Sequence, residues 1–64
     1  MRTEYDVQIT DKRGKITHCV LPKKKAEEMA NKLSEFYAQK DGFKVEFFKV
    51  IYNGSSLYKA EKIM

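Results

Sequence analysis

The chain is poor in the residue types that build metal centres and covalent cross-links. It has one cysteine, Cys19, and one histidine, His18. A single cysteine excludes an internal disulfide, and a structural zinc site needs four ligands drawn mostly from cysteine and histidine. If the two residues lie on a strand, their side chains point to opposite faces, so they cannot act as a catalytic pair. We therefore expect no metal site, a packed thiol and an ordinary strand histidine.

The sequence also lacks the features of membrane-spanning, exported and enzymatic proteins. No apolar run approaches the roughly 18 residues of a spanning helix, and the first residues lack the apolar segment of a signal peptide. A glycine-rich phosphate loop, a Gly-X-Ser-X-Gly elbow and a His-Glu-X-X-His motif are all absent. We expect a cytoplasmic protein that does not enter a membrane, binds no cofactor and is not an enzyme.

The length of 64 residues is enough for one small domain, covering residues 1–64. A chain of this size buries only about 60% of the surface that its unfolded form exposes, so its core is thin. With 42% hydrophobic residues, it is too hydrophobic for a disordered tail. The sequence therefore predicts one folded domain with a small core.

The first third of the chain has the pattern of a β-hairpin. Residues 4–10 alternate polar and apolar side chains, which indicates a strand with one buried face. The segment Asp11–Gly14 favours a type I turn that leads into a glycine bulge. Residues 16–21 are rich in β-formers and are predicted to be the returning strand.

The middle of the chain changes to a helical period. Pro22 suits the first position of a helix, which places Leu21 at the cap, and the helix is predicted over residues 22–41. Gly42 suits the left-handed position after a helix, with Phe43 folding back on the last turn in a Schellman motif. Apolar residues recur every three or four positions along one side: Ala26, Met29, Ala30, Leu33, Phe36 and Tyr37.

The last third has the pattern of a second hairpin. Residues 43–52 form a long strand, Asn53–Gly54 is a strong turn signal, and residues 56–64 form the final strand. The expected fold is α+β, a two-layer ββαββ domain in which one helix packs on a four-stranded antiparallel sheet. A right-handed crossover favours the strand order 2-1-3-4, and the order 1-2-3-4 stays open.

Basic residues lead to the first functional hypothesis, a small non-enzymatic accessory protein that binds nucleic acid. The net charge is +4, which permits attraction to phosphates. Three lysines open the helix at an end without a side-chain cap, where free N–H groups and ammonium groups can bind an anion. Aromatic residues interleave with lysines in the second hairpin, as in sheets that stack bases. The predicted phosphate contacts are Lys12, Arg13, Lys23, Lys24, Lys25, Lys49 and Lys59, and the predicted stacking groups are Phe48, Tyr52 and Tyr58.

Apolar residues lead to an alternative hypothesis, a protein-interaction module that is a homodimer or a small inhibitor or adaptor of a larger protein. Phe48, Val50 and Tyr52 are predicted to lie on the face of the sheet that the helix does not cover, and such patches commonly mark interfaces. The last strand adds to this face in one of two ways. A two- or four-residue turn brings Leu57 and Ile63 there, whereas a three-residue turn brings Tyr58 and Ala60.

Overall fold

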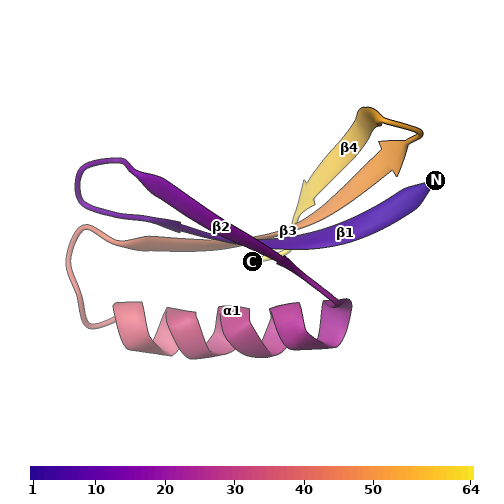
Figure 1. Cartoon of the computed structure of the whole chain (residues 1–64). Coiled ribbons are helices and arrows are strands. Elements are labelled where there is room, and N and C mark those ends of the chain that lie inside the picture. Colours follow the sequence, from indigo (N-terminus) through magenta and orange to yellow (C-terminus); the bar gives the residue numbers. More distant parts are fainter.

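The computed structural model describes all 64 residues and shows a ββαββ domain of two layers (Figure 1). One helix lies against one face of a four-stranded antiparallel sheet with the order β2-β1-β3-β4. The predicted fold class and the favoured strand order are thus confirmed. The elements are β1 (Arg2–Thr10), β2 (Ile16–Leu21), α1 (Lys23–Tyr37), β3 (Lys44–Asn53) and β4 (Ser56–Lys62).

The turn between β1 and β2 has the expected conformation. The N–H of Gly14 donates to the C=O of Asp11 at 3.0 Å, and Gly14 has a φ of 82°. The Asp11 carboxylate accepts hydrogen bonds from the backbone N–H groups of Arg13 and Lys15. This arrangement is a type I turn followed by a glycine bulge, held by an aspartate side chain.

The helix is shorter than the sequence predicts. It begins at Lys23 with Pro22 as the N-cap, one residue later than expected, and it ends at Tyr37 instead of residue 41. Gly42 has a φ of 85° but lies beyond the helix, so it does not form the predicted Schellman cap. A Cβ on Gly42 would come within 2.7 Å of Cγ of Lys12. Gly42 is therefore required by backbone conformation and by the close approach of the first turn.

The aromatic contact expected at this end does form. The rings of Phe43 and Tyr37 stack with centroids 4.8 Å apart. Phe36, in contrast, was expected to face the sheet with the rest of the apolar stripe. This expectation is wrong, because Phe36 is 57% exposed. At about 100° per residue it lies roughly 80° around the helix from Ala26, at the margin of the apolar stripe. Its ring packs edge-on against Tyr37, with the ammonium group of Lys40 4.5 Å from its centroid.

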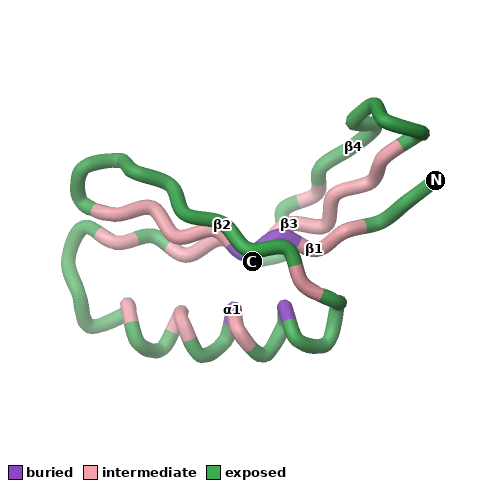
Figure 2. Tube along the Cα trace, in the orientation of Figure 1, coloured by how far each residue is buried: buried purple, intermediate pink, exposed green.

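The core is small and lies where β1 and β3 cross the helix (Figure 2). Its four buried apolar residues are Val7, Phe47, Ala26 and Ala30. The two alanines are one helical turn apart, and their small side chains let the helix approach the sheet closely. Partly buried residues pack around this cluster: Tyr5, Leu21, Met29, Leu33 and Val45.

The second hairpin follows neither of the two predicted registers throughout. Its turn brings Leu57 opposite Tyr52, on the face away from the helix. A bulge then shifts the register, and Ala60 comes opposite Val50 on that same face. Ile63, predicted on the outer face with Leu57, instead lies beside Phe47 on the helix side. The outer face thus takes Leu57 from one alternative and Ala60 from the other.

The helix does not combine the length and the apolar character that a membrane-crossing segment needs.

Candidate interaction surface

One end of the sheet extends beyond the helix. We call this end the open arm; it consists of residues Arg2–Glu4, Val50–Asn53 and Ser56–Ala60. Figure 1 shows β4 and the adjoining ends of β1 and β3 rising away from the helix layer. The helix contacts β1, β2 and β3 and makes no contact with β4. The helix therefore covers neither face of the β4 part of the open arm.

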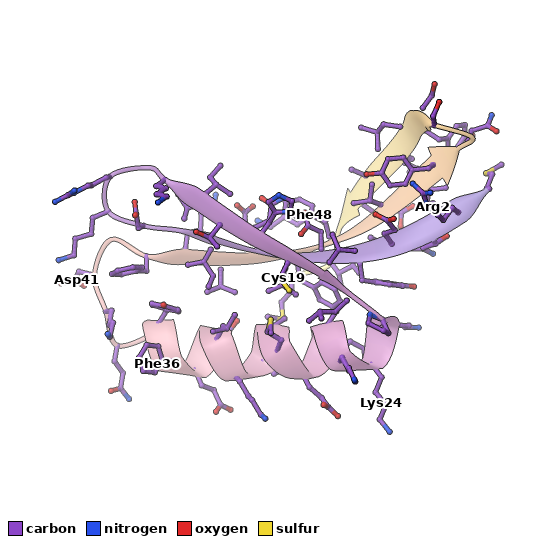
Figure 3. All side chains as sticks on the ribbon, viewed as in Figure 1. Arg2, Cys19, Lys24, Phe36, Asp41 and Phe48 are labelled. Carbon is purple, nitrogen blue, oxygen red and sulfur yellow. The ribbon has the colours of Figure 1, made fainter.

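The outer face of the sheet has an apolar strip that continues onto the open arm. Phe48, Val50 and Tyr52 are half-buried, and Leu57 is 62% exposed. Phe48 points away from the helix, as predicted (Figure 3). The Arg2 guanidinium lies 4.9 Å from the centroid of the Tyr52 ring, which covers part of that ring. Leu57 is the member of the strip with the most accessible apolar surface.

Tyr58 is the extra residue at the β4 bulge and is 63% exposed. No aromatic ring packs against it. A bulge in an edge strand displaces the side chain from regular pairing. Leu57 and Tyr58 therefore form two adjacent, exposed apolar groups at the end of the open arm.

Carboxylates line the same outer face. Glu4, Asp6 and Glu46 lie on this side according to the strand register. Glu46 forms ion pairs with Lys44 at 3.6 Å and with Lys62 at 3.4 Å, so the lysine opposite Phe48 in the sheet, Lys62, already has a carboxylate partner. A phosphate backbone following the strip would meet these carboxylates, which disfavours the predicted stacking of bases there.

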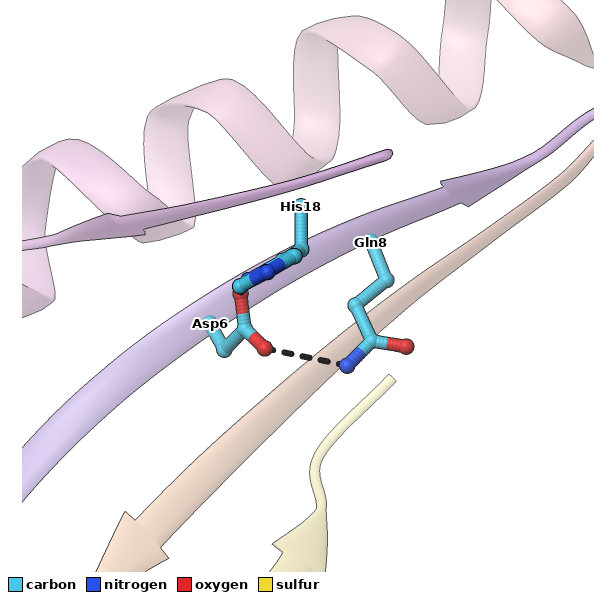
Figure 4. A network of polar contacts seen from close by, with 3 residues as sticks. All are labelled: Asp6, Gln8 and His18. Carbon is cyan, nitrogen blue, oxygen red and sulfur yellow. Dashed lines mark hydrogen bonds and ion pairs between the residues drawn. The ribbon is translucent and has the colours of Figure 1, made fainter. Parts of the chain in front are cut away.

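Asp6 belongs to a polar network at the centre of this face (Figure 4). It is only 8% exposed, and Gln8 donates a hydrogen bond from Nε2 to its Oδ2 at 2.9 Å. Nδ1 of His18 lies 3.3 Å from the other carboxylate oxygen. These contacts satisfy a carboxylate that would otherwise be costly to bury. Sequence reasoning missed this network because its residues lie on two strands.

His18 and Cys19 lie on opposite faces of β2, as expected. Cys19 is exposed, however, whereas the sequence predicts a packed thiol. Figure 3 shows its side chain on the helix side of the sheet. β2 is an edge strand and the helix packs mainly on β1 and β3, which leaves the thiol accessible. No group of three or more His, Cys, Asp or Glu side chains is placed to hold a metal ion.

The two basic clusters are at opposite ends of the molecule. Lys12 and Arg13 lie on the β1–β2 turn, and Lys23–Lys25 lie in the first turn of the helix. Lys24 points away from the sheet (Figure 3). All five residues are exposed and none forms an ion pair. The helix N-terminus has no side-chain cap and no acidic residue in its first turn.

Lys49 and Lys59 are separated from the aromatic residues they were expected to accompany. The register places both on the helix side of the sheet, whereas Phe48 and Tyr52 are on the outer face. Lys59 forms an ion pair with Glu61 at 2.9 Å. The pKa of Glu61 is lower than its ordinary value. The main causes are a hydrogen bond from Lys59 and the positive charge of Lys59, and the charge of Lys49 adds to them.

The structure thus brings together Phe48, Val50, Tyr52 and Leu57, which were predicted as interface residues, and it does not join the predicted phosphate contacts to the stacking groups. No protein-family model, curated protein or solved structure matches this chain. The geometry of the surface is therefore the basis for a functional proposal.

Proposed function

We propose that this chain is a small non-enzymatic protein-interaction module whose binding surface is the open arm. The observation that carries the proposal is that Leu57 and Tyr58, two large apolar residues in adjacent positions, are more than 60% exposed on an uncovered end of the sheet. Contiguous apolar groups on a folded domain commonly mark an interface. Burying each of these two side chains contributes up to roughly 1.5–3 kcal/mol to association.

The thin core also supports this function. Only five of the 64 residues are buried, and the largest side chain that is fully buried is that of Val7. A domain with so little internal burial gains a large share of its stability from any partner that binds the folded state. One hollow beside the end of the helix is lined by Phe36 and four polar or charged residues, and another is lined mainly by apolar residues, among them Tyr37, Phe43 and Val45.

A second candidate function is phosphate or nucleic-acid binding at the start of the helix. The specific observation is that Lys23, Lys24 and Lys25 have no carboxylate partner and lie in a first helical turn that no side chain caps. It is the second candidate because the outer-face carboxylates lie beside the aromatic groups, and because the other basic cluster is at the far end.

Size-exclusion chromatography with light scattering, at low and high salt and with a short mixed nucleic acid, separates the two functions. An apolar interface keeps its complex as salt rises, whereas a nucleic-acid complex dissociates steeply. The same run with Leu57→Ser shows whether the open arm is responsible for a complex that survives salt. Capture of proteins from an extract of the source cells, with wild type and Leu57→Ser compared, extends the test to other partners.

The proposal expects a salt-resistant complex, with itself or with another protein, that Leu57→Ser weakens. A wild-type monomer that captures the same proteins as Leu57→Ser would contradict it. Co-elution with nucleic acid that is lost at high salt, together with its loss in a Lys23, Lys24 and Lys25 alanine variant, would favour the second candidate.

A further inference from the structure

Strand β4 is at the end of the sheet and pairs on one side only, with β3. The backbone of Phe47 faces β4, because its N–H donates to the C=O of Met64 and its C=O accepts from the N–H of Ile63. In an antiparallel ladder, alternate residues turn their backbone groups to the same neighbour. Lys49 and Ile51 therefore face β4 as well.

The backbone groups on the far side of β4 are free. Glu61 and Lys59 are the partners of the β3 residues just named, so their N–H and C=O groups point to β3. Ala60 and Lys62 alternate with them and direct their backbone groups to the open edge. Every residue from Ser56 to Ala60 is exposed. Such an edge readily pairs with another strand.

The side chains on this edge are self-complementary. Lys59 and Glu61 flank Ala60, and both lie on the helix side of the sheet. We propose that two copies of the chain pair in antiparallel orientation through β4, with a two-fold axis at Ala60. In this register Lys59 of each copy lies opposite Glu61 of the other, and the backbone groups of the two Ala60 residues bond to each other.

The charges select this register over its neighbours. An axis at Lys59 would place the two Lys59 ammonium groups opposite each other, and an axis at Glu61 would do the same with two carboxylates. The axis at Ala60 also brings Tyr58 opposite Lys62 of the second copy. The exposed Leu57 lies at the margin of the same interface.

The resulting dimer has one continuous sheet of eight strands, with both helices on the same face. The inference names a second copy as the partner of the interaction module, and it rests on the proposed function. It also removes the exposed β4 edge, which in a monomer invites unspecific pairing.

Charge exchange between the two edge residues tests the register. Lys59→Glu places two carboxylates opposite each other in each cross-strand pair, and Glu61→Lys places two ammonium groups there. Each variant should therefore raise the dimer dissociation constant by roughly tenfold or more. The double variant Lys59→Glu/Glu61→Lys restores opposite charges and should restore the dimer. An equimolar mixture of the two single variants should form a heterodimer, because its cross-strand pairs again join a carboxylate to an ammonium group.

The controls are charge reversals on the exposed side of the helix. Lys32→Glu and Glu35→Lys change the net charge by the same amounts as the edge variants and should leave the dimer unchanged. Ala60→Pro supplies a test that alters no charge. Proline removes the N–H that points to the free edge, a position where edge strands tolerate it, and should give a monomer with native circular dichroism.

The measurement is sedimentation velocity over about 10 μM to 1 mM, the concentration range of weak dimers. Recovery of the dimer in the mixture of single variants supports the proposed register. A wild-type dimer whose dissociation constant does not change in either single variant, or in Ala60→Pro, overturns the register while supporting the interaction module. A wild-type monomer overturns the inference. In that case the capture experiment with Leu57→Ser decides separately whether the module has another partner.

Discussion

The half of the sheet beneath the helix contains every buried apolar side chain of the sheet, whereas the open arm contains none. Phe47 and Ile51 illustrate the difference, since they lie on the same strand and the same face. Phe47 is 3% exposed because Ala26 and Ala30 pack over that part of the sheet. Ile51, four residues further along, lies beyond the helix and is only partly buried. Alternation along a strand thus sets the face of a residue, but the length of the covering helix decides its burial.

The largest effect is expected from a substitution in the covered half. Phe47→Ala removes the main aromatic group of the core and should lower the free energy of unfolding by about 3–5 kcal/mol. Phe48→Ala is the matched control, because it removes the same side chain from the uncovered face. Because Phe48 is only partly buried, Phe48→Ala should lower the free energy of unfolding by roughly 1–2 kcal/mol. Chemical denaturation of both variants measures the difference, and equal losses would show that the helix is not the main source of stability.

A smaller effect is expected at Gly42. Gly42→Ala forces an alanine into left-handed backbone, at about 1–2 kcal/mol, and adds a Cβ against the Lys12 side chain. Gly54→Ala has the same backbone strain, with a φ of 66°, but its Cβ would meet no atom within 4 Å. Thermal unfolding should therefore give a lower melting temperature for Gly42→Ala than for Gly54→Ala. The reverse ranking would argue against the contact between the first turn and the loop after the helix.

The open arm should tolerate substitution. Leu57→Ser removes an exposed apolar group that no other layer covers, so the stability of the monomer should change by no more than about 0.5 kcal/mol. Thermal unfolding at a concentration too low for association measures this value. A loss comparable to that of Phe47→Ala would mean that the arm packs against the rest of the chain.

The smallest effect is expected from the pH dependence of stability that Glu61 contributes. Because the pKa of Glu61 is lowered in the folded state, its contribution to stability is complete above the unfolded pKa of about 4.3. That contribution is lost as the pH falls through the lower folded-state pKa. Urea unfolding at neutral and acidic pH should show a slightly weaker pH dependence in Glu61→Gln than in wild type. Identical pH profiles would indicate that Lys59 does not interact with Glu61 in solution.

Local signals predicted most of the fold. The alternation in residues 4–10 and the Asp11–Gly14 turn each have a local physical cause, and both are observed. The strand order followed from the handedness of the crossover. The helix end was misplaced because Gly42 has the conformation of a cap residue, while the reason for it lies in Lys12, thirty positions earlier. A distant contact of this kind leaves no local pattern in the sequence.

The candidate site was less predictable for similar reasons. Phe48, Val50 and Tyr52 were assigned to the outer face by alternation alone, which is sufficient within one regular strand. The turn of the second hairpin consists of Gly54 and Ser55, one residue later than the predicted Asn53–Gly54. It does not specify the β4 bulge, so the faces of Tyr58 and Ala60 could not be derived. The separation of Lys49 from Phe48 follows from the same alternation, because neighbours in a strand lie on opposite faces, and the hypothesis of a joint binding surface overlooked it. The face of Lys59, in contrast, depends on the β4 bulge.

The central position of β1 has a consequence for the order of folding. Val7 pairs with Phe47, forty residues later, and this pairing forms the middle of the sheet. During synthesis β1 can form its hairpin with β2, but a two-stranded hairpin alone is marginally stable. Until β3 has been synthesised, the helix that follows can pack only against this hairpin. Folding of the whole domain therefore waits for a contact of long sequence separation, and we expect it to be slower than in helical domains of the same size.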